Sequence, residues 1–448
     1  KVYYEHEKPL SEIPDEPEIP AEPEIPDEPE IPDEPEIPDE PGKNPGYSDE
    51  EIEEIEELIK KGYIPIATAE ELNSIRDTSA RTYGKGTKWE NKYEGGLDKK
   101  YIQVANVDLS GYSEGEGWVP IGDENSKFTG SFNGNGYSIT GLTIDKPETD
   151  YIGLFGYTEG ATIENVALED INIKGTGDTG GLVGRANEST IRNSYATGSV
   201  TGTGDYTGGL VGRAEWRTEI SNSYATGEVS GTGDYTMAAG GLVGYASRAS
   251  VITNSYATGE VSSTGDYVGG LVGNANSSTT IENSYATGEV SSTGKHYTGG
   301  LVGYAGGSTI TNSYATGSVT GSDYTGGLVG EASGSTISNS YATGSVKGSA
   351  TGGLVGWALD GTKISNSYAT GKVSGEDYIG GLVGYAETST ITNSYWDTET
   401  TGQSKSAGGT GKSTNEMKMS TTYDGWDFKN TWEINEGQSY PTLKNIAN

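Results

Sequence analysis

Short apolar segments recur at nearly constant spacing between residues 150 and 400, and glycines flank them. The segment Gly-Gly-Leu-Val-Gly occurs eight times, with its leucines 26 to 32 residues apart. A tyrosine in an Asn-Ser-Tyr segment follows each leucine after 13 or 14 residues, whereas 13 to 18 residues separate that tyrosine from the next leucine. The constant half of the repeat predicts stacked strands, and the variable half predicts a surface turn. The leucines are Leu182, Leu210, Leu242, Leu271, Leu301, Leu328, Leu354 and Leu382.

A repeat of this length restricts the architecture of the array. Gly-Gly-Leu-Val-Gly disfavours a helix, because each glycine costs about 1 kcal/mol in a helix interior. Propeller blades need about 40 residues or more. We therefore expect an all-β fold, namely a parallel β-solenoid of about 12 coils. Three short strands per coil are expected at GGLVGxA, STITNSYA and GSV or GEVS.

Stacked coils would align like residues in columns along the solenoid axis, with about 4.8 Å between neighbours. Alternation in the segment Ile191-Arg192-Asn193-Ser194-Tyr195 places Ile, Asn and Tyr on one face of a strand. We expect the stacked asparagine amides to hydrogen-bond from coil to coil. Stability would come from stacking, because a single coil buries few apolar side chains.

Further regions flank the repeats. A capping-box pattern at Ser48-Asp49-Glu50-Glu51 predicts one helix, and Thr68 opens a second helix with Leu72 and Ile75 facing inward. Such helices are typical of a solenoid cap. The expected regions are a proline-rich arm at 1–47, short capping helices at 48–78, lead-in coils at 79–150, the repeat solenoid at 151–400 and a C-terminal cap at 401–448.

The arm contains five copies of Glu-Ile-Pro-Asp-Glu-Pro in residues 12–41, one of them with Ala21 in place of Asp. Proline at every third position matches the three-residue turn of polyproline II. The arm is either a stiff spacer or a docking arm that binds a neighbouring subunit, and a spacer has no need of isoleucine. The candidate docking residues are Val2, Tyr3, Tyr4, Ile13, Ile19, Ile25, Ile31 and Ile37.

Composition and charge narrow the function. The 448 residues carry a formal net charge of −36, which repels phosphate backbones, so we expect no nucleic-acid partner. No run of about 18 apolar residues occurs, and we expect no membrane insertion. The absence of cysteine and the presence of only two histidines leave few ligands for a zinc site. A start at Lys1 instead of Met predicts an exported, cell-surface protein whose signal sequence has been removed, or a trimmed chain.

The segments GGLVG and NSYATG resemble the GLUG motif, a short repeat of bacterial and archaeal surface proteins, adhesins and some IgA-cleaving metalloproteases. The resemblance covers residues 150–400, and the segments around Trp118 and Trp432 resemble the lead-in and closing segments of such proteins. It implies a right-handed β-helix and an extracellular surface protein. It implies no particular activity, because the motif is a scaffold.

Candidate catalytic and metal-binding residues are few. The zinc-binding HExxH helix of the metalloprotease relatives is absent, since His6 and His296 lie in other settings, and we expect no enzyme. Acids in the variable turns are weak calcium candidates, although Lys295 and Ala350 interrupt their column, and the alternative is a solvated rim. Apart from calcium we expect no cofactor. The calcium candidates are Asp178, Asp205, Asp234 and Asp266.

The residue after each GGLVG varies, although the repeat around it is regular. This variation predicts an outward column, and several of its members are aromatic. Such residues bind sugars or a neighbouring subunit, or they form unused surface. The candidate contact residues are Arg185, Arg213, Tyr245, Tyr304, Trp357 and Tyr385.

Two functional hypotheses follow. In the first, the protein is a non-enzymatic structural subunit, and its arm docks on a neighbour to build a homo-oligomeric cell-surface filament. Residues 12–41 would extend about 93 Å as polyproline II, which exceeds a body of about 58 Å. In the alternative, the protein is a surface adhesin whose solenoid binds a glycan or a host protein, with the arm as a tether.

Overall fold

The described residues belong to one of two compact units of the chain, Pro35–Asn448. The computed structural model describes residues 47–146, 149–233, 236–444 and 446. The eight candidate docking residues of the arm, from Val2 to Ile37, therefore lie outside the described residues, as does the calcium candidate Asp234.

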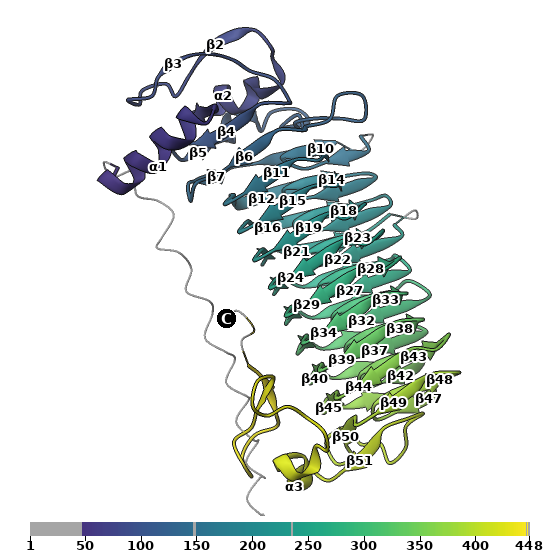
Figure 1. Ribbon diagram of the computed structural model, residues 1–448. Helices are drawn as coiled ribbons and strands as arrows, with labels where there is room; N and C mark the ends of the chain where they lie inside the picture. Colours follow the sequence, from purple (N-terminus) through teal and green to yellow (C-terminus); the bar gives the residue numbers. More distant parts are fainter. Residues whose placement is uncertain (1–46, 147–148, 234–235, 445, 447–448) are drawn as a thin grey trace, which may run out of the picture. The chain divides into compact units, whose positions relative to one another are not determined.

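Successive coils stack as parallel strands, and each coil passes through four sheets (Figure 1). We name these the Val, Ile, Tyr and Thr sheets, after the residue that each coil repeats there. Leu182 donates its N–H to the carbonyl oxygen of Leu210 (2.9 Å), and Leu210 donates to Leu242 (3.0 Å). The predicted vertical stacking of these leucines is confirmed.

The strands of the four sheets have the following bounds. The Val sheet contains β10 (Phe155–Glu159), β14 (Val183–Asn187), β18 (Val211–Glu215), β23 (Val243–Ala246), β28 (Val272–Asn276), β33 (Val302–Gly306), β38 (Val329–Ser333), β43 (Val355–Leu359) and β48 (Val383–Ala386). The Ile sheet contains β1 (Tyr63–Ile66), β4 (Lys100–Gln103), β6 (Ser131–Asn133), β11 (Thr162–Glu164), β15 (Thr190–Arg192), β19 (Glu219–Ser221), β24 (Val251–Thr253), β29 (Thr280–Glu282), β34 (Thr309–Thr311), β39 (Thr336–Ser338), β44 (Lys363–Ser365) and β49 (Thr390–Thr392).

The other two sheets complete each coil. The Tyr sheet contains β5 (Val107–Asp108), β7 (Ser138–Thr140), β8 (Thr143–Lys146), β12 (Ala167–Gly175), β16 (Tyr195–Gly202), β20 (Tyr224–Ala225), β21 (Glu228–Gly231), β25 (Tyr256–Ala257), β26 (Val261–Ser263), β30 (Tyr285–Ala286), β31 (Val290–Ser292), β35 (Tyr314–Ala315), β36 (Val319–Thr320), β40 (Tyr341–Ala342), β41 (Val346–Lys347), β45 (Tyr368–Ala369), β46 (Val373–Ser374), β50 (Tyr395–Asp397) and β51 (Thr410–Lys412). The Thr sheet contains β9 (Tyr151–Ile152), β13 (Asp178–Gly180), β17 (Tyr206–Gly208), β22 (Ala238–Gly240), β27 (Tyr267–Gly269), β32 (Tyr297–Gly299), β37 (Tyr324–Gly326), β42 (Ala350–Gly352) and β47 (Asp377–Gly380).

The predicted all-β solenoid is confirmed, with about ten coils where about 12 were expected. The Ile sheet has twelve strands but the Val and Thr sheets have nine each, because residues 63–150 add three strands to the Ile sheet and none to the other two. Three strands per coil was also wrong. From β20 onward a coil has five short strands, since the Tyr sheet receives two from each coil. The right-handed sense stays a prediction.

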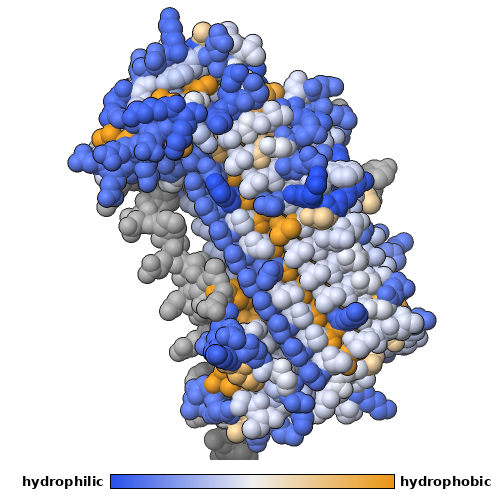
Figure 2. All heavy atoms as spheres, in the orientation of Figure 1, coloured by the Kyte–Doolittle hydropathy of each residue, from blue (hydrophilic) through white to orange (hydrophobic). Residues whose placement is uncertain are grey.

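One continuous core fills the interior of the solenoid. The leucine of every GGLVG segment has no exposed surface, and the valine after it and the isoleucine of the Ile sheet pack in the same cluster. Burial of each such side chain contributes about 1.5–3 kcal/mol. Like residues lie one above another, and Figure 2 shows the result on the surface as a narrow hydrophilic stripe across successive coils.

The predicted strand STITNSYA is divided by a corner at its asparagine. The asparagines at this position, such as Asn193 and Asn312, have φ between 47° and 55°, a left-handed conformation that ends the strand. The placement of Ile, Asn and Tyr on one face is therefore wrong. Ile191 points into the core, Asn193 forms the corner, and Ser194 is buried. The asparagine ladder itself is confirmed, since Asn193 donates to Asn165 (3.1 Å) and Asn312 donates to Asn283 (3.2 Å).

A column of buried serines adjoins the asparagine corner. Ser284 donates its backbone N–H to the hydroxyl oxygen of Ser313 (3.2 Å), and Ser313 donates in the same way to Ser340 (3.3 Å). Each hydroxyl then donates to the carbonyl oxygen two residues earlier, as Ser284 does to Glu282 (2.8 Å). The hydroxyls thereby satisfy backbone groups that the corner removes from the strand ladder.

Short helices and a hairpin close the first end of the solenoid (Figure 1). α1 (Asp49–Lys60) begins at the capping box of Ser48, and α2 (Ala69–Asn73) begins at Thr68, as predicted. Leu72 and Ile75 are fully buried in the solenoid core. The remaining elements here are η1 (Ser74–Arg76), the antiparallel strands β2 (Ala80–Tyr83) and β3 (Asn91–Glu94), and η2 (Ser110–Tyr112).

The C-terminal residues close the other end of the solenoid. Trp396 takes the place of Ala369 in the coil above it and fills the end of the core. Gly381 then donates to Lys405 (2.9 Å) and Val383 donates to Ser406 (2.8 Å), so the last coil has its edge paired. The cap contains α3 (Thr414–Met417), η3 (Ser420–Thr422), β52 (Trp432–Glu433) and β53 (Thr442–Leu443).

Candidate binding surface

Two columns of outward side chains lie side by side along the solenoid and form what we call the aromatic strip. One column follows the GGLVG segments on the Val sheet, and the other lies on the Thr sheet. The strands are in register, so each column holds one residue per coil. The Val-sheet column is Arg185, Arg213, Tyr245, Asn274, Tyr304, Glu331, Trp357 and Tyr385. The Thr-sheet column includes Tyr206, Tyr267, Tyr297 and Tyr324, and Tyr378 lies in its last strand.

Glycine brings the two columns together. The last glycine of GGLVG has no room for a side chain, because a Cβ on Gly303 would lie 2.6 Å from the backbone nitrogen of Val268 in the Thr sheet. Gly330 is in the same position, with Thr298 N at 2.7 Å. The Val and Thr sheets therefore approach at backbone distance, and the side chains that point outward from them share one surface.

The rings of the strip contact one another from coil to coil. Tyr267 stacks with Tyr297 (5.3 Å between ring centroids), and Tyr297 stacks with Tyr324 (5.4 Å). Tyr324 lies 4.7 Å from Trp357, and Trp357 stacks with Tyr385 at 4.0 Å. This contact chain spans the second half of the repeat array. Such rings are suited to packing against sugars or protein side chains.

Tyr378 closes the far end of this chain of rings. Its ring is nearly perpendicular to those of Trp357 (5.3 Å, 80°) and Tyr385 (5.4 Å, 82°). Tyr378 is 58% exposed, the highest value among the large hydrophobic residues of the strip. It is therefore the most solvent-accessible of these rings.

The first coils of the strip contain cations that the chain neutralises itself. Arg185 and Arg213 each donate to Glu215, at 2.8 and 2.9 Å, and Glu215 is only 1% exposed. Arg213 also lies over the rings of Tyr206 (5.1 Å) and Tyr245 (5.2 Å). The positive charges of these two arginines are therefore paired within the protein, and most of the surface of each side chain is covered.

Asp178 lies beside these arginines. It is 4% exposed, and burial raises its pKa to about 7, although Arg213 and Arg185 act in the opposite direction. It pairs in register with Tyr206 and not with Asp205, so the expected column of turn acids does not include it. Among the described residues, no group of three or more His, Cys, Asp or Glu side chains is placed to hold a metal ion.

Two polar residues of the Val-sheet column have a different environment. Glu331 is 8% exposed, and no hydrogen bond or ion pair joins it to another residue of the described chain. Burial, with a smaller effect from Asp360, raises the pKa of Glu331 to about 7. The amide oxygen of Asn274, at 7% exposure, also has no hydrogen-bond partner among the described residues.

Sequence reasoning identified one column of the strip and missed the other. The signal for the Thr-sheet tyrosines was present, since Tyr206, Tyr267, Tyr297 and Tyr324 each stand two residues before the glycine pair of a GGLVG segment. That half of the repeat varies in length, and this variation by itself predicts a surface turn. Glu331 stands in the predicted column but carried no signal of burial.

A second aromatic column lies on the Tyr sheet. Its tyrosine rings stack nearly parallel, as in Tyr285–Tyr314 (4.9 Å, 0°). The C-terminal cap covers the last members, because Trp432 lies 6.1 Å from both Tyr341 and Tyr368. This column anchors the cap and is therefore structural.

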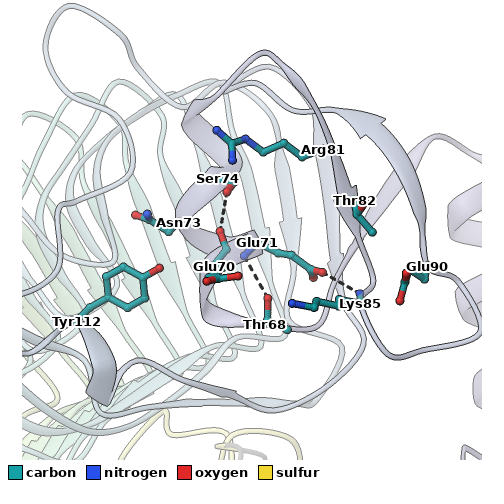
Figure 3. A pocket seen from close by; sticks show the side chains of 10 residues that line it. All are labelled: Thr68, Glu70, Glu71, Asn73, Ser74, Arg81, Thr82, Lys85, Glu90 and Tyr112. Carbon is teal, nitrogen blue, oxygen red and sulfur yellow. Dashed lines mark hydrogen bonds between the residues drawn. The ribbon is translucent and has the colours of Figure 1, made fainter.

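A pocket lies beside α2, and its central polar side chains form hydrogen bonds within the protein (Figure 3). Its central carboxylate, Glu71, accepts hydrogen bonds from the backbone N–H groups of Ala67 (2.7 Å) and Lys85 (2.8 Å). The backbone N–H of Glu71 donates to the hydroxyl oxygen of Thr68 (3.3 Å), and Thr68 thereby caps α2. These bonds hold the N-terminal cap together and leave Glu71 with a structural role.

The geometry defines a capped β-solenoid repeat protein with an aromatic strip along one side. Eight stretches match the GLUG motif, and the chain therefore contains eight GLUG-motif repeats. The matched residues are 175–201, 203–230, 235–262, 264–291, 294–320, 321–347, 347–374 and 375–395.

Relatives share only short parts with this chain. Halomucin of Haloquadratum walsbyi is 37% identical over 127 residues, which are 26% of this chain and 1% of halomucin. A protein of Evansella cellulosilytica, assigned as a Gly-rich membrane protein, is 40% identical over 108 residues, or 20% of this chain and 12% of its own length. The immunoglobulin A1 protease of Streptococcus sanguinis is 38% identical over 90 residues, which are 20% of this chain and 4% of that protease. This chain thus spans a small fraction of each relative.

One solved structure matches most of this chain. It belongs to a Bacteroides ovatus protein assigned as an immunoglobulin A1 protease, and the match covers 85% of this chain and 92% of that one, with 17% identity and a TM-score of 0.42. No helix in the described part of the chain is long and apolar enough to cross a membrane.

Proposed function

We propose that this chain is a non-enzymatic extracellular surface protein, an adhesin whose solenoid presents the aromatic strip to a glycan or a host protein. The observation that carries the proposal is the contact chain of half-buried rings from Tyr267 to Tyr385. Aromatic side chains with one covered and one accessible side are enriched at binding surfaces. The names of the relatives halomucin and Gly-rich membrane protein support a location at the cell surface.

The chemistry of the strip supports binding over catalysis. Its accessible groups are rings, and among the described residues its two buried carboxylates without a bonded partner, Asp178 and Glu331, lie in separate coils. Hydrolysis of a glycosidic bond by the common mechanism needs two carboxyl groups that flank the bond. Release of reducing sugar from a bound glycan would contradict a non-enzymatic role.

Binding of the full-length protein to a glycan array and to immobilised host-cell surface proteins tests the proposal. Trp357→Ala removes the ring that contacts Tyr324, Tyr378 and Tyr385, and we expect it to weaken binding at least about tenfold, as for a hot-spot aromatic residue. Trp216→Ala is the matched control, because Trp216 is 46% exposed and lies outside the strip. Equal binding by Trp357→Ala and the wild type would overturn the proposal.

A second candidate function is the filament subunit, and the repeats of the arm favour it. Both ends of the solenoid are closed by caps, so coils cannot simply continue from one subunit into the next. Assembly would then depend on the arm and its regularly spaced isoleucines. Electron microscopy of the full-length protein should show fibres, and deletion of residues 1–45 should leave short monomeric rods. Fibres formed by the shortened chain would contradict this candidate.

A further inference from the structure

Glu331 is surrounded by a frame of four rings. In the Val sheet, Tyr304 lies one coil before Glu331 and Trp357 lies one coil after it. In the Thr sheet, Tyr297 contacts Tyr304 (5.4 Å), Tyr324 contacts Trp357 (4.7 Å), and Tyr297 stacks on Tyr324 (5.4 Å). We call Tyr297, Tyr304, Tyr324 and Trp357 the Glu331 frame.

The carboxylate inside this frame has no cation of its own among the described residues. Glu331 is more than nine-tenths buried, and the charged group that most affects it is another acid, Asp360. A buried charge without a partner is costly, and a carboxylate is stabilised chiefly by hydrogen-bond donors that carry positive charge. The faces of tyrosine and tryptophan rings also attract cations.

The first coils of the same strip show the complete arrangement. Arg213 lies over the rings of Tyr206 and Tyr245 and donates to the buried Glu215 (2.9 Å). Arg185 lies 5.2 Å over the ring of Tyr157 and donates to the same carboxylate (2.8 Å). In those coils the protein itself supplies the cation, the rings and the carboxylate. At Glu331 the described residues supply rings and acid only.

We propose that the Glu331 frame binds the guanidinium or primary ammonium group of an Arg or Lys side chain on a partner protein. Such a group carries the N–H donors that the carboxylate needs and the charge that the rings attract. The net charge of −36 favours the approach of a basic partner. This inference rests on the proposed function and selects a host protein over a glycan as the ligand of the strip.

Ligand-observed NMR on the full-length protein tests the inference with three small probes. The probes are the N-acetyl methylamides of arginine, lysine and citrulline, and citrulline has nearly the shape of arginine without its charge. We expect the arginine and lysine probes to bind and the citrulline probe to show no binding. Glu331→Gln should weaken binding of the charged probes about tenfold or more, because it removes the negatively charged acceptor of their N–H groups.

The control variant is Glu282→Gln, which removes an outward acid from the Ile sheet and should leave probe binding unchanged. Circular dichroism of both variants checks that the solenoid is folded. Equal binding of citrulline and arginine, or unchanged binding by Glu331→Gln, would overturn the inference. If Trp357→Ala abolishes surface binding while no charged probe binds, the inference alone fails. If Trp357→Ala leaves surface binding intact, the proposed function fails.

Discussion

At the scale of single residues, neighbouring polar side chains of one segment have opposite tasks. In Asn-Ser-Tyr the asparagine turns the chain at positive φ and hydrogen-bonds along the surface, while the serine enters the core and satisfies backbone groups. The asparagine ladder could be predicted from stacking alone. The corner could not, because a positive φ at asparagine leaves no mark on the alternation of the sequence.

The buried Glu331 gives the solenoid a pH-dependent stability. Its folded pKa of about 7 lies above the ordinary value of 4.5, so the folded state is stabilised fully below pH 4.5 and loses that contribution as the pH rises through 7. Tyr297, Tyr304 and Asp360 face the same region, and none of them supplies a positive charge. We expect Glu331→Gln to raise the melting temperature by roughly 2 °C or more at pH 8 and by less at pH 4. Thermal scans at both pH values check this, and an equal effect at both would contradict it.

At the scale of elements, the Val and Thr sheets meet because glycine stands where they touch. From the sequence pattern these glycines disfavour a helix, and the structure adds a second role, a contact between backbones of adjoining sheets. The sequence pattern also did not reveal the tyrosine column of the Thr sheet. A half-repeat of variable length indicates a turn, although only the residues between β21 and β22 and their equivalents vary, and the strands beside them are regular.

Gly303→Ala tests the sheet contact. The new Cβ would lie 2.6 Å from Val268 N and from the carbonyl oxygen of Gly273, and backbone atoms at this distance cannot move aside without separating the sheets. We expect a loss of about 1–3 kcal/mol or more in the free energy of unfolding, measured by urea denaturation. Gly111→Ala is the control, because no atom lies within 4 Å of its added Cβ. Similar midpoints for Gly303→Ala and the wild type would show that the sheets are more adaptable than their packing indicates.

At the scale of the whole molecule, the repeats determine how the coils stack, and the flanking segments determine where the stack ends. The coil spacing and columns could be predicted from GGLVG and NSYATG because each coil repeats the same contacts. The caps have no repeat, and their contacts are specific. Trp396 ends the core by replacing the alanine that precedes it in its column, and residues 405–407 pair with the last coil. Sequence reasoning placed a cap at 401–448 but had no means of assigning these contacts.

Removal of the C-terminal cap therefore tests whether the ends keep the protein from stacking. A chain ending at residue 400 exposes the edge of the last coil at Gly381 and Val383, together with the tyrosine rings that Trp432 covers. Unpaired strand edges with apolar neighbours join to other edges. We expect the shortened chain to associate end to end, with a rise in light scattering and in sedimentation coefficient. Deletion of residues 1–45 is the matched control, since it leaves both caps in place and should not promote stacking. A monomeric chain of residues 1–400 would show that the cap stabilises the last coil without preventing assembly.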